Sequence, residues 1–535
     1  MCIRDRLYID GNIETPHGSY EYNDTLDYQS DQIHIGMEPN GGGNFDGLIS
    51  NVRVVAGTAV YTSLFRPPIK PLTNITNTKL LCCNNSSVTG KTVGPTITAT
   101  DSPTASTDSP FADPASFKFG EEGDQSIIKT GSYIGNGNSD GPEIISGWEP
   151  QWVLVKNTSS NDSWRIFDSM RGIVTGGDDA LIHPNSNGAE YSGNTNEMDL
   201  TSTGFKIAIN DSGVNGSGST YIYMAIRRPD SDVAKPPEAG TDVFAIDAGN
   251  SSSIEAFTSG FPVDYVFYRT VNTSFSWYTT ARMLQGTYAK TNLTDAFTSS
   301  VYTVFDLMTG FHNYSGYGST TYAWMWKRHA GFDVVTYKGN AVAGRQIKHN
   351  LNVTPEMVVV KKRNSTQNWY TYHKGLNGGT NPELKTVMLN SSDAEDSAGS
   401  FTFNNTAPTS TVFSLASSHA TNGSGDTYIA LLFASVEGIS KVGSFTGTGA
   451  SQTITTGFRP RFLILRKSST GGGPWYVLDT TRGWTSGNDQ YINLNETTAQ
   501  TGYEFGAPTA TGFTITATAA TINGSGENIL YYAHA

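Results

Sequence analysis

The residue pattern best suited to chemistry is an aspartate followed three positions later by an arginine, which occurs in two places. The pairs are Asp168 with Arg171 and Asp479 with Arg482. A carboxylate whose pKa is set by a neighbouring guanidinium can act as a catalytic acid. The same spacing also suits a turn in which the aspartate accepts backbone N–H groups and the arginine holds it. Two of the four repeats described below lack the pair, so we interpret it as structural and predict no enzyme and no catalytic residue.

Aromatic residues are the second group of candidates, because a flat ring stacks on the apolar face of a sugar. Four tryptophans recur at intervals of roughly 100 residues: Trp164, Trp277, Trp369 and Trp475. A tryptophan that returns at one place in every repeat is more often a core residue than a binding residue. Its neighbour along a strand points to the opposite face. As exposed glycan contacts we therefore predict these neighbours: Arg165, Tyr278, Tyr370 and Tyr476.

Metal-ligating residues are not gathered along the sequence. Histidines are scattered from His17 to His534 without the spacing of a zinc site. The chain has three cysteines, of which Cys82 and Cys83 are adjacent, so a disulfide framework is not expected. The sequence has no phosphate-binding glycine loop, Ser-His-Asp order or paired-carboxylate motif. We predict no cofactor, apart from the calcium considered below.

The elements that must position these residues repeat along the chain. Asn-Gly-Ser-Gly followed by an apolar run occurs three times, and a degenerate copy begins at Ser315. Asn-Gly supplies the positive φ angles of a tight hairpin, and the apolar run is typical of a strand. We predict structural turns at Asn215-Gly216, Asn422-Gly423 and Asn523-Gly524. On these φ grounds Gly524→Val should destabilise the last domain by roughly 1 to 3 kcal/mol, with little effect on its neighbours.

Upstream of each turn lies an apolar strand that begins at a proline and precedes the strand carrying the tryptophan. A period of roughly 100 residues is too long for a solenoid unit and suits a small domain. We predict four tandem β-sandwich repeats at 114–230, 238–330 (degenerate), 331–436 and 437–535. The proline-rich stretch 227–240 is predicted to be a stiff spacer, across which few contacts pass.

Composition indicates an all-β chain and restricts its partners. Charged residues make up 16% of the chain, and 57 glycines accompany 26 tyrosines and 25 phenylalanines, as in a β-protein with many turns. The formal charge of −13 argues against a nucleic acid or an anionic membrane as partner. There is no apolar run of membrane-spanning length and no charged-then-apolar leader, so a signal-peptide route is not expected.

The N-terminal part follows a different pattern. Ile33-His34-Ile35-Gly36 precedes an apolar stretch at 44–55, and another strand pattern covers 77–82. Together these segments resemble the second half of the concanavalin-like, laminin-G-like jelly roll of marine phage structural proteins, over residues 7–113. The first strands of that domain are missing. Residues 1–6 resemble a translated sequencing-adapter scar, which implies that the chain begins inside a domain.

The jelly-roll resemblance also implies that calcium can bind through loop carboxylates. Asp10 and Asp46 are weak candidates among five aspartates, the others being Asp24, Asp27 and Asp31. The alternative is that these carboxylates are solvated loop charges.

The four tandem units resemble an uncharacterised repeat domain found beside laminin-G-like domains in phage tail and virion proteins. The matching features are the proline-led strand, the tryptophan strand, the Asn-Gly-Ser-Gly turn and the Thr-Gly-Phe segments at 203–205 and 511–513. Together the two resemblances imply a partial concanavalin-like jelly roll followed by four small β-sandwich domains, in a non-enzymatic structural or receptor-binding component of a phage virion.

In that role, as a tail fibre or appendage, the chain is expected to contact host-surface glycans, through the jelly roll or the repeats, and other virion proteins. An oligomer is compatible with it. The alternatives are a polysaccharide-degrading tail enzyme and a bacterial adhesin at the cell surface.

Overall fold

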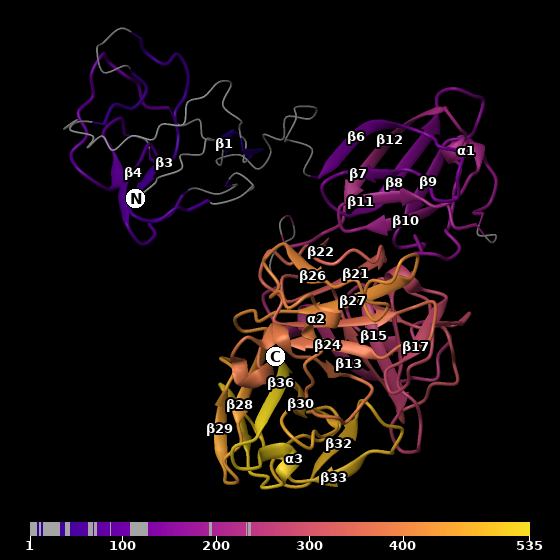
Figure 1. The fold of residues 1–535 in the computed structure, drawn as a ribbon. Helices are drawn as coiled ribbons and strands as arrows, with labels where there is room; N and C mark the ends of the chain where they lie inside the picture. Colours follow the sequence, from indigo (N-terminus) through magenta and orange to yellow (C-terminus); the bar gives the residue numbers. More distant parts are fainter. Residues whose placement is uncertain are drawn as a thin grey trace. The chain divides into compact units, whose positions relative to one another are not determined.

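The chain forms two compact units, Met1–Phe119 and Gly120–Ala535, and nearly all its regular structure is β-strand (Figure 1). The computed structural model describes residues 33–37, 43–61, 68, 72–85, 87–106, 127–191, 195–231, 233 and 237–535, together with the backbone of β1 (Tyr8–Ile9) and β2 (Asn12–Ile13). The predicted all-β fold of sandwich domains is confirmed. No helix in the described residues is long and apolar enough to cross a membrane.

The first unit contains a three-stranded antiparallel sheet in the order β3-β4-β5. Its strands are Val52–Val55, Thr78–Cys82 and Lys91–Val93. Three consecutive residues of β4, Leu80, Leu81 and Cys82, are buried. The predicted scar at 1–6 and the calcium candidate Asp10 lie outside the described residues, and Asp46 lies exposed in a loop.

The second unit contains four copies of one sandwich, here called repeats 1 to 4 in chain order. Each repeat has a large sheet in which the last strand lies between the first strand and the proline-led strand. In repeat 1 the large sheet is β6 (Ile128–Ile134), β12 (Thr220–Arg227), β8 (Pro150–Asn157) and β9 (Arg165–Asp168). In repeat 2 it is β13 (Phe244–Ala248), β20 (Thr321–Trp326), β15 (Tyr265–Thr270), β16 (Tyr278–Ala281), β17 (Thr287–Lys290) and β18 (Thr298–Ser299).

Repeats 3 and 4 have the same order. In repeat 3 the large sheet is β21 (Phe332–Lys338), β27 (Thr427–Phe433), β23 (Met357–Lys362), β24 (Trp369–His373) and β25 (Val387–Met388). In repeat 4 it is β28 (Ser440–Thr446), β36 (Asn528–His534), β30 (Phe462–Lys467), β31 (Trp475–Asp479), β32 (Asp489–Asn493) and β33 (Thr501–Tyr503).

A small sheet covers one face of each large sheet. The small sheets are β7 (Glu143–Ile145), β10 (Met198–Thr201) and β11 (Gly204–Ile207); β14 (Phe257–Thr258) and β19 (Gly310–Phe311); β22 (Arg345–Lys348) and β26 (Val412–Leu415); and β29 (Gln452–Thr455), β34 (Pro508–Thr509) and β35 (Gly512–Ile515). The helices are single turns: α1 (Ser212–Asn215), α2 (Gly399–Thr402), α3 (Ala520–Asn523) and short 3₁₀ segments at Gly240–Asp242, Arg282–Leu284, Leu376–Gly379 and Pro382–Leu384. Repeats 2, 3 and 4 each bury an apolar core between their two sheets.

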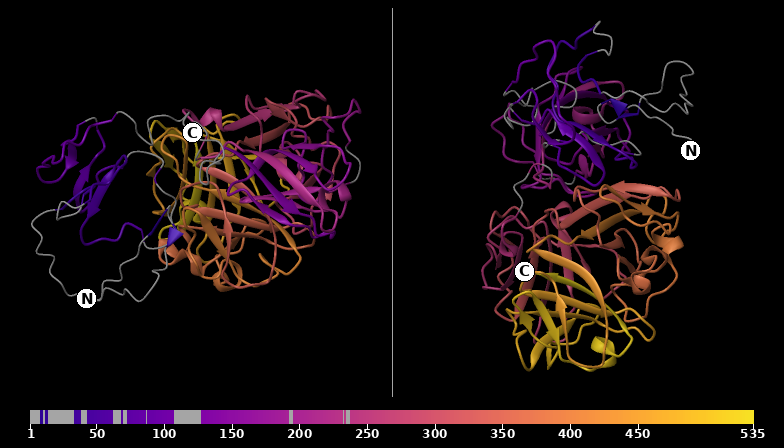
Figure 2. Two further views of the ribbon diagram at one scale, coloured as in Figure 1. Left: turned by 90° about the horizontal axis from the view of Figure 1, so that it is seen from above. Right: turned by 90° about the vertical axis from the view of Figure 1, so that its left-hand side faces the viewer.

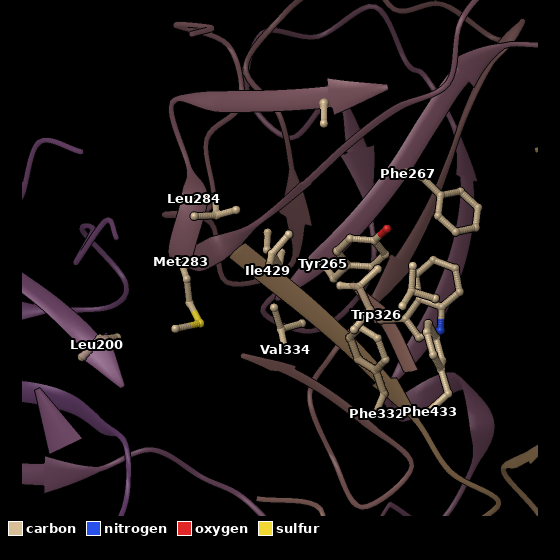
Figure 3. Packing of buried hydrophobic residues seen from close by; sticks show 14 of the residues in the cluster. Leu200, Tyr265, Phe267, Met283, Leu284, Trp326, Phe332, Val334, Ile429 and Phe433 are labelled. Carbon is tan, nitrogen blue, oxygen red and sulfur yellow. The ribbon is translucent and has the colours of Figure 1, made fainter. Parts of the chain in front are cut away.

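The other faces of the large sheets of repeats 2, 3 and 4 meet in a common core. Figure 3 shows part of it, where Tyr265 and Trp326 of repeat 2 lie beside Phe332 and Phe433 of repeat 3. Strand register places the apolar residues in rows across each face, such as Val334, Leu431 and Val359 in repeat 3. Ring centroids of neighbouring repeats lie 5.7 Å apart for Trp326 and Phe462, 5.7 Å for Tyr265 and Phe332, and 4.9 Å for Phe433 and Tyr532. A cavity of about 30 Å³ lies where the three faces meet. These three repeats therefore form a closed three-repeat ring.

The recurring tryptophans close this ring. The indole N–H of Trp277 in repeat 2 donates to Asn493 O in repeat 4 (2.7 Å), and that of Trp475 in repeat 4 donates to Met388 O in repeat 3 (3.0 Å). Trp369 in repeat 3 donates to Leu293 O in repeat 2 (3.1 Å), which completes the cycle. All three are buried, as predicted for core residues, whereas Trp164 in repeat 1 is only partly buried.

A basic residue accompanies each of these tryptophans. Arg269, Lys361 and Arg466 each lie over the ring of the tryptophan at or just before the start of the next strand, at 5.2 to 5.8 Å. Each also donates to backbone carbonyls of the same neighbouring repeat that the tryptophan reaches, for example Lys361 Nζ to Thr294 O at 2.7 Å. The joints are thus built from one repeated pair of donors.

The expectation of independent domains is therefore wrong for the second unit. One continuous apolar cluster contains residues from all four repeats. The predicted spacer also makes contacts: Arg228 lies 3.4 Å from Asp333 and Ser231 donates to Asn350 O at 2.5 Å. Both faces of an apolar sheet must be shielded from water. The small sheet of each sandwich shields only one face, so in repeats 2, 3 and 4 the neighbouring repeats shield the other.

The Asn-Gly-Ser-Gly turns differ from the prediction in their backbone angles. The first glycine has φ of −57° at Gly216 and −56° at Gly524, and Gly423 is also outside the left-handed region. The last glycine of the motif is the one with positive φ, 79° at Gly526. Gly524 is instead required by close packing, since a Cβ there would lie 2.9 Å from Ala520.

The asparagine of the motif is a buried bridge. Asn422 Oδ1 accepts from Asn340 N at 3.0 Å, and its Nδ2 donates to Val342 O and Ala416 O at 3.0 and 2.9 Å. Asn215 and Asn523 make the equivalent bonds in repeats 1 and 4. The side chain thus ties the last turn to the loop that follows the first strand.

We expect Asn422→Ala to lower the free energy of unfolding by roughly 2 to 4 kcal/mol, because it leaves buried backbone groups without partners. Ser424→Ala, in the exposed part of the same turn, is the matched control and should change it by less than about 0.5 kcal/mol. Denaturant unfolding of both variants measures the difference. Equal effects of the two substitutions would show that the asparagine is not a structural bridge.

Candidate functional site

The four predicted glycan contacts lie in three different environments and are not brought together. Tyr370 and Tyr476 are buried, each 8% exposed, so their prediction as exposed contacts is wrong. They point into their own sandwich, where the ring of Tyr476 lies 5.1 Å from that of Phe505. The small sheet covers the face of the large sheet opposite the tryptophan. A side chain on that face is therefore buried rather than exposed to solvent.

Arg165 is held by two carboxylates. Its guanidinium lies 2.6 Å from Glu197 and 2.5 Å from Asp211. Burial lowers the Arg165 pKa, but the two carboxylates outweigh it and raise the pKa above its ordinary value. Because both ends of its guanidinium are paired, Arg165 is built into repeat 1 and is a weak candidate for a ligand contact.

The two aspartate–arginine pairs form turns. In repeat 4, Asp479 accepts from the Arg482 backbone N at 2.8 Å and from its Nε at 2.7 Å, and both side chains are nearly inaccessible to solvent. Asp479 also accepts from Trp324 Nε1 at 3.1 Å. In repeat 1, Asp168 and Arg171 make the same pair of bonds. This geometry favours the structural interpretation of both pairs.

Tyr278 is the one predicted contact that lies in a larger group of aromatic residues. This group, here called the repeat-2 aromatic surface, comprises Phe275, Tyr278, Tyr288, Tyr302, Tyr314 and Tyr317. All six are at least partly exposed, and Tyr302 and Tyr314 are 45% and 39% exposed. The group has the composition of a stacking surface for an amphipathic ligand.

The rings of this surface form two groups that are joined by one buried ring, Tyr268. Tyr278 lies 5.5 Å from Phe275 and 4.9 Å from Tyr288. On the other side, the buried Tyr268 stacks on Tyr278 at 5.5 Å and contacts Tyr317 at 5.5 Å.

From Tyr317 the series continues to the exposed residues. Tyr314 lies 5.0 Å from Tyr317 and 4.8 Å from Tyr302. Strands β15, β16 and β17 carry Tyr268, Tyr278 and Tyr288. Phe275 lies in the loop before β16, and the 301–320 segment carries Tyr302, Tyr314 and Tyr317. Tyr317 lies in the degenerate turn, where repeats 1, 3 and 4 have serine in Asn-Gly-Ser-Gly, so this part of the surface is specific to repeat 2.

His312 lies beneath these rings and is 1% exposed. Its ring centroid is 4.9 Å from Tyr317, 5.4 Å from Tyr268 and 6.4 Å from Tyr302, and neither ring nitrogen has a hydrogen-bond partner in the described structure. Burial lowers the pKa of His312 to about 3. The imidazole is therefore neutral at pH 7.

Electrostatics also favours an uncharged ligand. Burial raises the pKa of Tyr317 to about 12, so its hydroxyl stays protonated. The nearest cation over a ring is Lys290, whose Nζ lies 5.7 Å from the Tyr278 centroid. Flat rings with neutral hydroxyls suit stacking on a sugar, with hydrogen bonds at the ring edges.

Sequence reasoning found Tyr278 but missed the rest of this surface. A usable signal was present, because repeat 2 holds eight of the 26 tyrosines in the chain. Among the residues that the structure describes, no group of three or more histidine, cysteine or acidic residues could hold a metal ion.

The chain belongs to the family described as a domain of unknown function, DUF7483, whose model matches residues 73–229 and 245–535. The match covers the four repeats and begins inside the predicted jelly roll. No curated protein matches the chain.

Proposed function

We propose that the chain is a non-enzymatic structural and receptor-binding component of a phage virion, such as a tail fibre or appendage, whose repeat-2 aromatic surface contacts host-surface glycans. The virion setting rests on the resemblances of the jelly-roll and repeat segments. The glycan contact rests on one observation, the series of partly exposed rings from Phe275 to Tyr302, whose two halves are joined by the buried ring of Tyr268.

The other three repeats supply a scaffold for this surface. Their candidate chemical groups are used internally, since the Asp479 and Arg482 side chains lock a turn and the Arg165 guanidinium is paired twice. The ring joints hold repeat 2 between repeats 3 and 4 through backbone carbonyls. A rigid, preorganised aromatic surface loses little entropy on binding.

We expect the full chain to bind immobilised capsular polysaccharide or lipopolysaccharide from a host bacterium, and Tyr302→Ala/Tyr314→Ala to weaken binding at least tenfold, equal to about 1.4 kcal/mol. Tyr503→Ala, which removes a 40% exposed tyrosine of repeat 4, is the matched control and should bind normally. Surface plasmon resonance measures both. Unchanged binding by the double variant would show that the glycan does not contact the repeat-2 aromatic surface. The predicted jelly roll at 7–113 would then be the next candidate.

Incubation of the chain with the same polysaccharide separates the proposed binding role from an enzymatic one. Release of reducing ends from the polysaccharide would replace the proposal by a polysaccharide-degrading tail enzyme. Electron microscopy with an antibody to the chain distinguishes a virion component, which labels particles, from an adhesin, which labels bacterial cells.

A further inference from the structure

Repeat 1 has an apolar sheet face that is covered in the other three repeats. In β12 the register aligns Ile222, Met224 and Ile226 with Lys156, Leu154 and Trp152 of β8. The same register in repeat 3 aligns Ile429, Leu431 and Phe433 with Lys361, Val359 and Met357. The repeat 3 residues are buried in the common core, whereas Ile222 is 41% exposed and Trp152, Leu154, Met224 and Ile226 are partly exposed.

Repeat 1 also carries the donor half of a ring joint. Trp164 corresponds to the three ring tryptophans, because its backbone N donates to Asn185 as theirs donate to Asn292, Asn390 and Asn495. Within the described residues, however, its indole donates to no other repeat. Lys156, the counterpart of Lys361, donates to the adjacent carbonyl of Asn157 at 2.6 Å.

The acceptor half of the joint is present as well. In two ring joints the accepting carbonyl lies two residues before the asparagine, at Met388 and Asn493, in a turn closed by the N–H three residues later. In the third joint Lys290 O, two residues before Asn292 in the same kind of turn, accepts from Trp369 at 3.3 Å beside Leu293 O. Repeat 1 has the same turn at His183, whose carbonyl accepts from Ser186 N at 3.0 Å. Repeat 1 is thus complementary to another copy of itself.

The rest of the second unit attaches to repeat 1 elsewhere. Thr175 N donates to Met283 O at 2.9 Å, and the Thr175 hydroxyl lies 3.1 Å from that of Thr336. Figure 1 shows β10, in the small sheet, on the side of repeat 1 nearest β21 and β22. Figure 2 shows the same unit from two further directions. Among the residues that the structure describes in this unit, these contacts do not use the outer face of β6, β12, β8 and β9.

We propose that three copies of this chain associate through repeat 1, forming a second three-sided core like the three-repeat ring. In this assembly the apolar faces of three repeats 1 meet, and each Trp164 indole donates to His183 O of the next copy. In the three-repeat ring, the corresponding faces form a closed arrangement with three members. A closed trimer of repeat 1 would likewise pair every Trp164 indole with a His183 carbonyl. This inference stands independently of the glycan proposal.

Sedimentation velocity on the full chain at 1 to 50 µM tests the proposal, with an expected mass of three times 57.5 kDa. Met224→Glu places a charge at the centre of the apolar face and should raise the midpoint concentration of assembly at least tenfold. Ile254→Glu, at a 73% exposed position of repeat 2, is the matched control and should leave the trimer unchanged. A melting curve establishes that each variant is folded.

Trp164→Phe keeps the ring and removes only the indole donor, so it gives a second reading if Met224→Glu fails to fold. It should weaken assembly by about threefold to tenfold. A monomeric wild-type chain, a dimer, or a trimer unaffected by the folded face and indole variants would each overturn the proposal.

Discussion

Replacing Arg328 by methionine is expected to destabilise the second unit by roughly 3 to 5 kcal/mol, because it removes the closer of the two cations that pair with the buried carboxylates of Glu149 and Asp333 and leaves only Arg228, at 3.3 and 3.4 Å. Arg328 is 4% exposed at its side chain and donates to both oxygens of Glu149, at 2.7 and 2.6 Å, and to Asp333 at 2.8 Å. Its backbone N donates to Asp264 at 2.7 Å. This network joins repeats 1, 2 and 3 at one point.

Urea unfolding of the full chain measures the effect, and Lys338→Met is the control. Lys338 also pairs with an aspartate, Asp140, but both side chains are more than half exposed, so its loss should cost less than about 1 kcal/mol. Burial by itself raises the Asp333 pKa, yet Arg328 and Arg228 outweigh it and lower the pKa below the ordinary value. If Arg328→Met costs no more than the control, the buried network does not hold the repeats together.

The second unit is expected to lose several kcal/mol of stability as the pH falls from about 6.5 to 4.5, because buried histidines are neutral in the folded state. Burial lowers the pKa of His329 to about 3 and that of His373 to about 4, and it also lowers the pKa of His534. An unfolded histidine binds its proton near pH 6.5, so acid favours the unfolded chain. At pH 5 each group contributes about 2 kcal/mol to this loss.

Urea unfolding at several pH values between 7.5 and 4.5 measures this dependence. The His373 ring accepts from Gly375 N at 3.0 Å and lies 3.3 Å from Tyr531 O, so His373→Gln keeps one polar side chain there while removing the titration. With His312 included, four buried histidines contribute, so this variant should show about a quarter less loss on acidification. His419→Gln removes a histidine whose side chain is 81% exposed, and serves as the control. Asp333 does not contribute to this loss. A carboxyl group with a lowered pKa stabilises the folded state while it is ionised, and that stabilisation is lost only below about pH 4. A pH-independent stability above pH 4.5 would contradict the prediction.

The local properties of this chain were determined by sequence alone. The all-β class, the four repeats and the core role of Trp277, Trp369 and Trp475 follow from turn residues and alternating apolar residues, which act within a few positions of each other. The turn made by Asp479 and Arg482 is local in the same sense. Such motifs can be identified in the sequence because the residues that form them lie within a few positions of each other.

Properties that depend on what covers a strand were decided only by the tertiary structure. Alternation indicates that Tyr370 and Tyr476 oppose their tryptophans, but both faces of these sheets are covered, one by the small sheet and one by the ring. The positive φ belongs to Gly526 rather than Gly524, and Asn523 of the same turn is a buried bridge to residues outside the turn. The ring joints, the Arg328 network and the repeat-2 aromatic surface each unite residues far apart in the chain, and such pairings leave no periodic signal in the sequence.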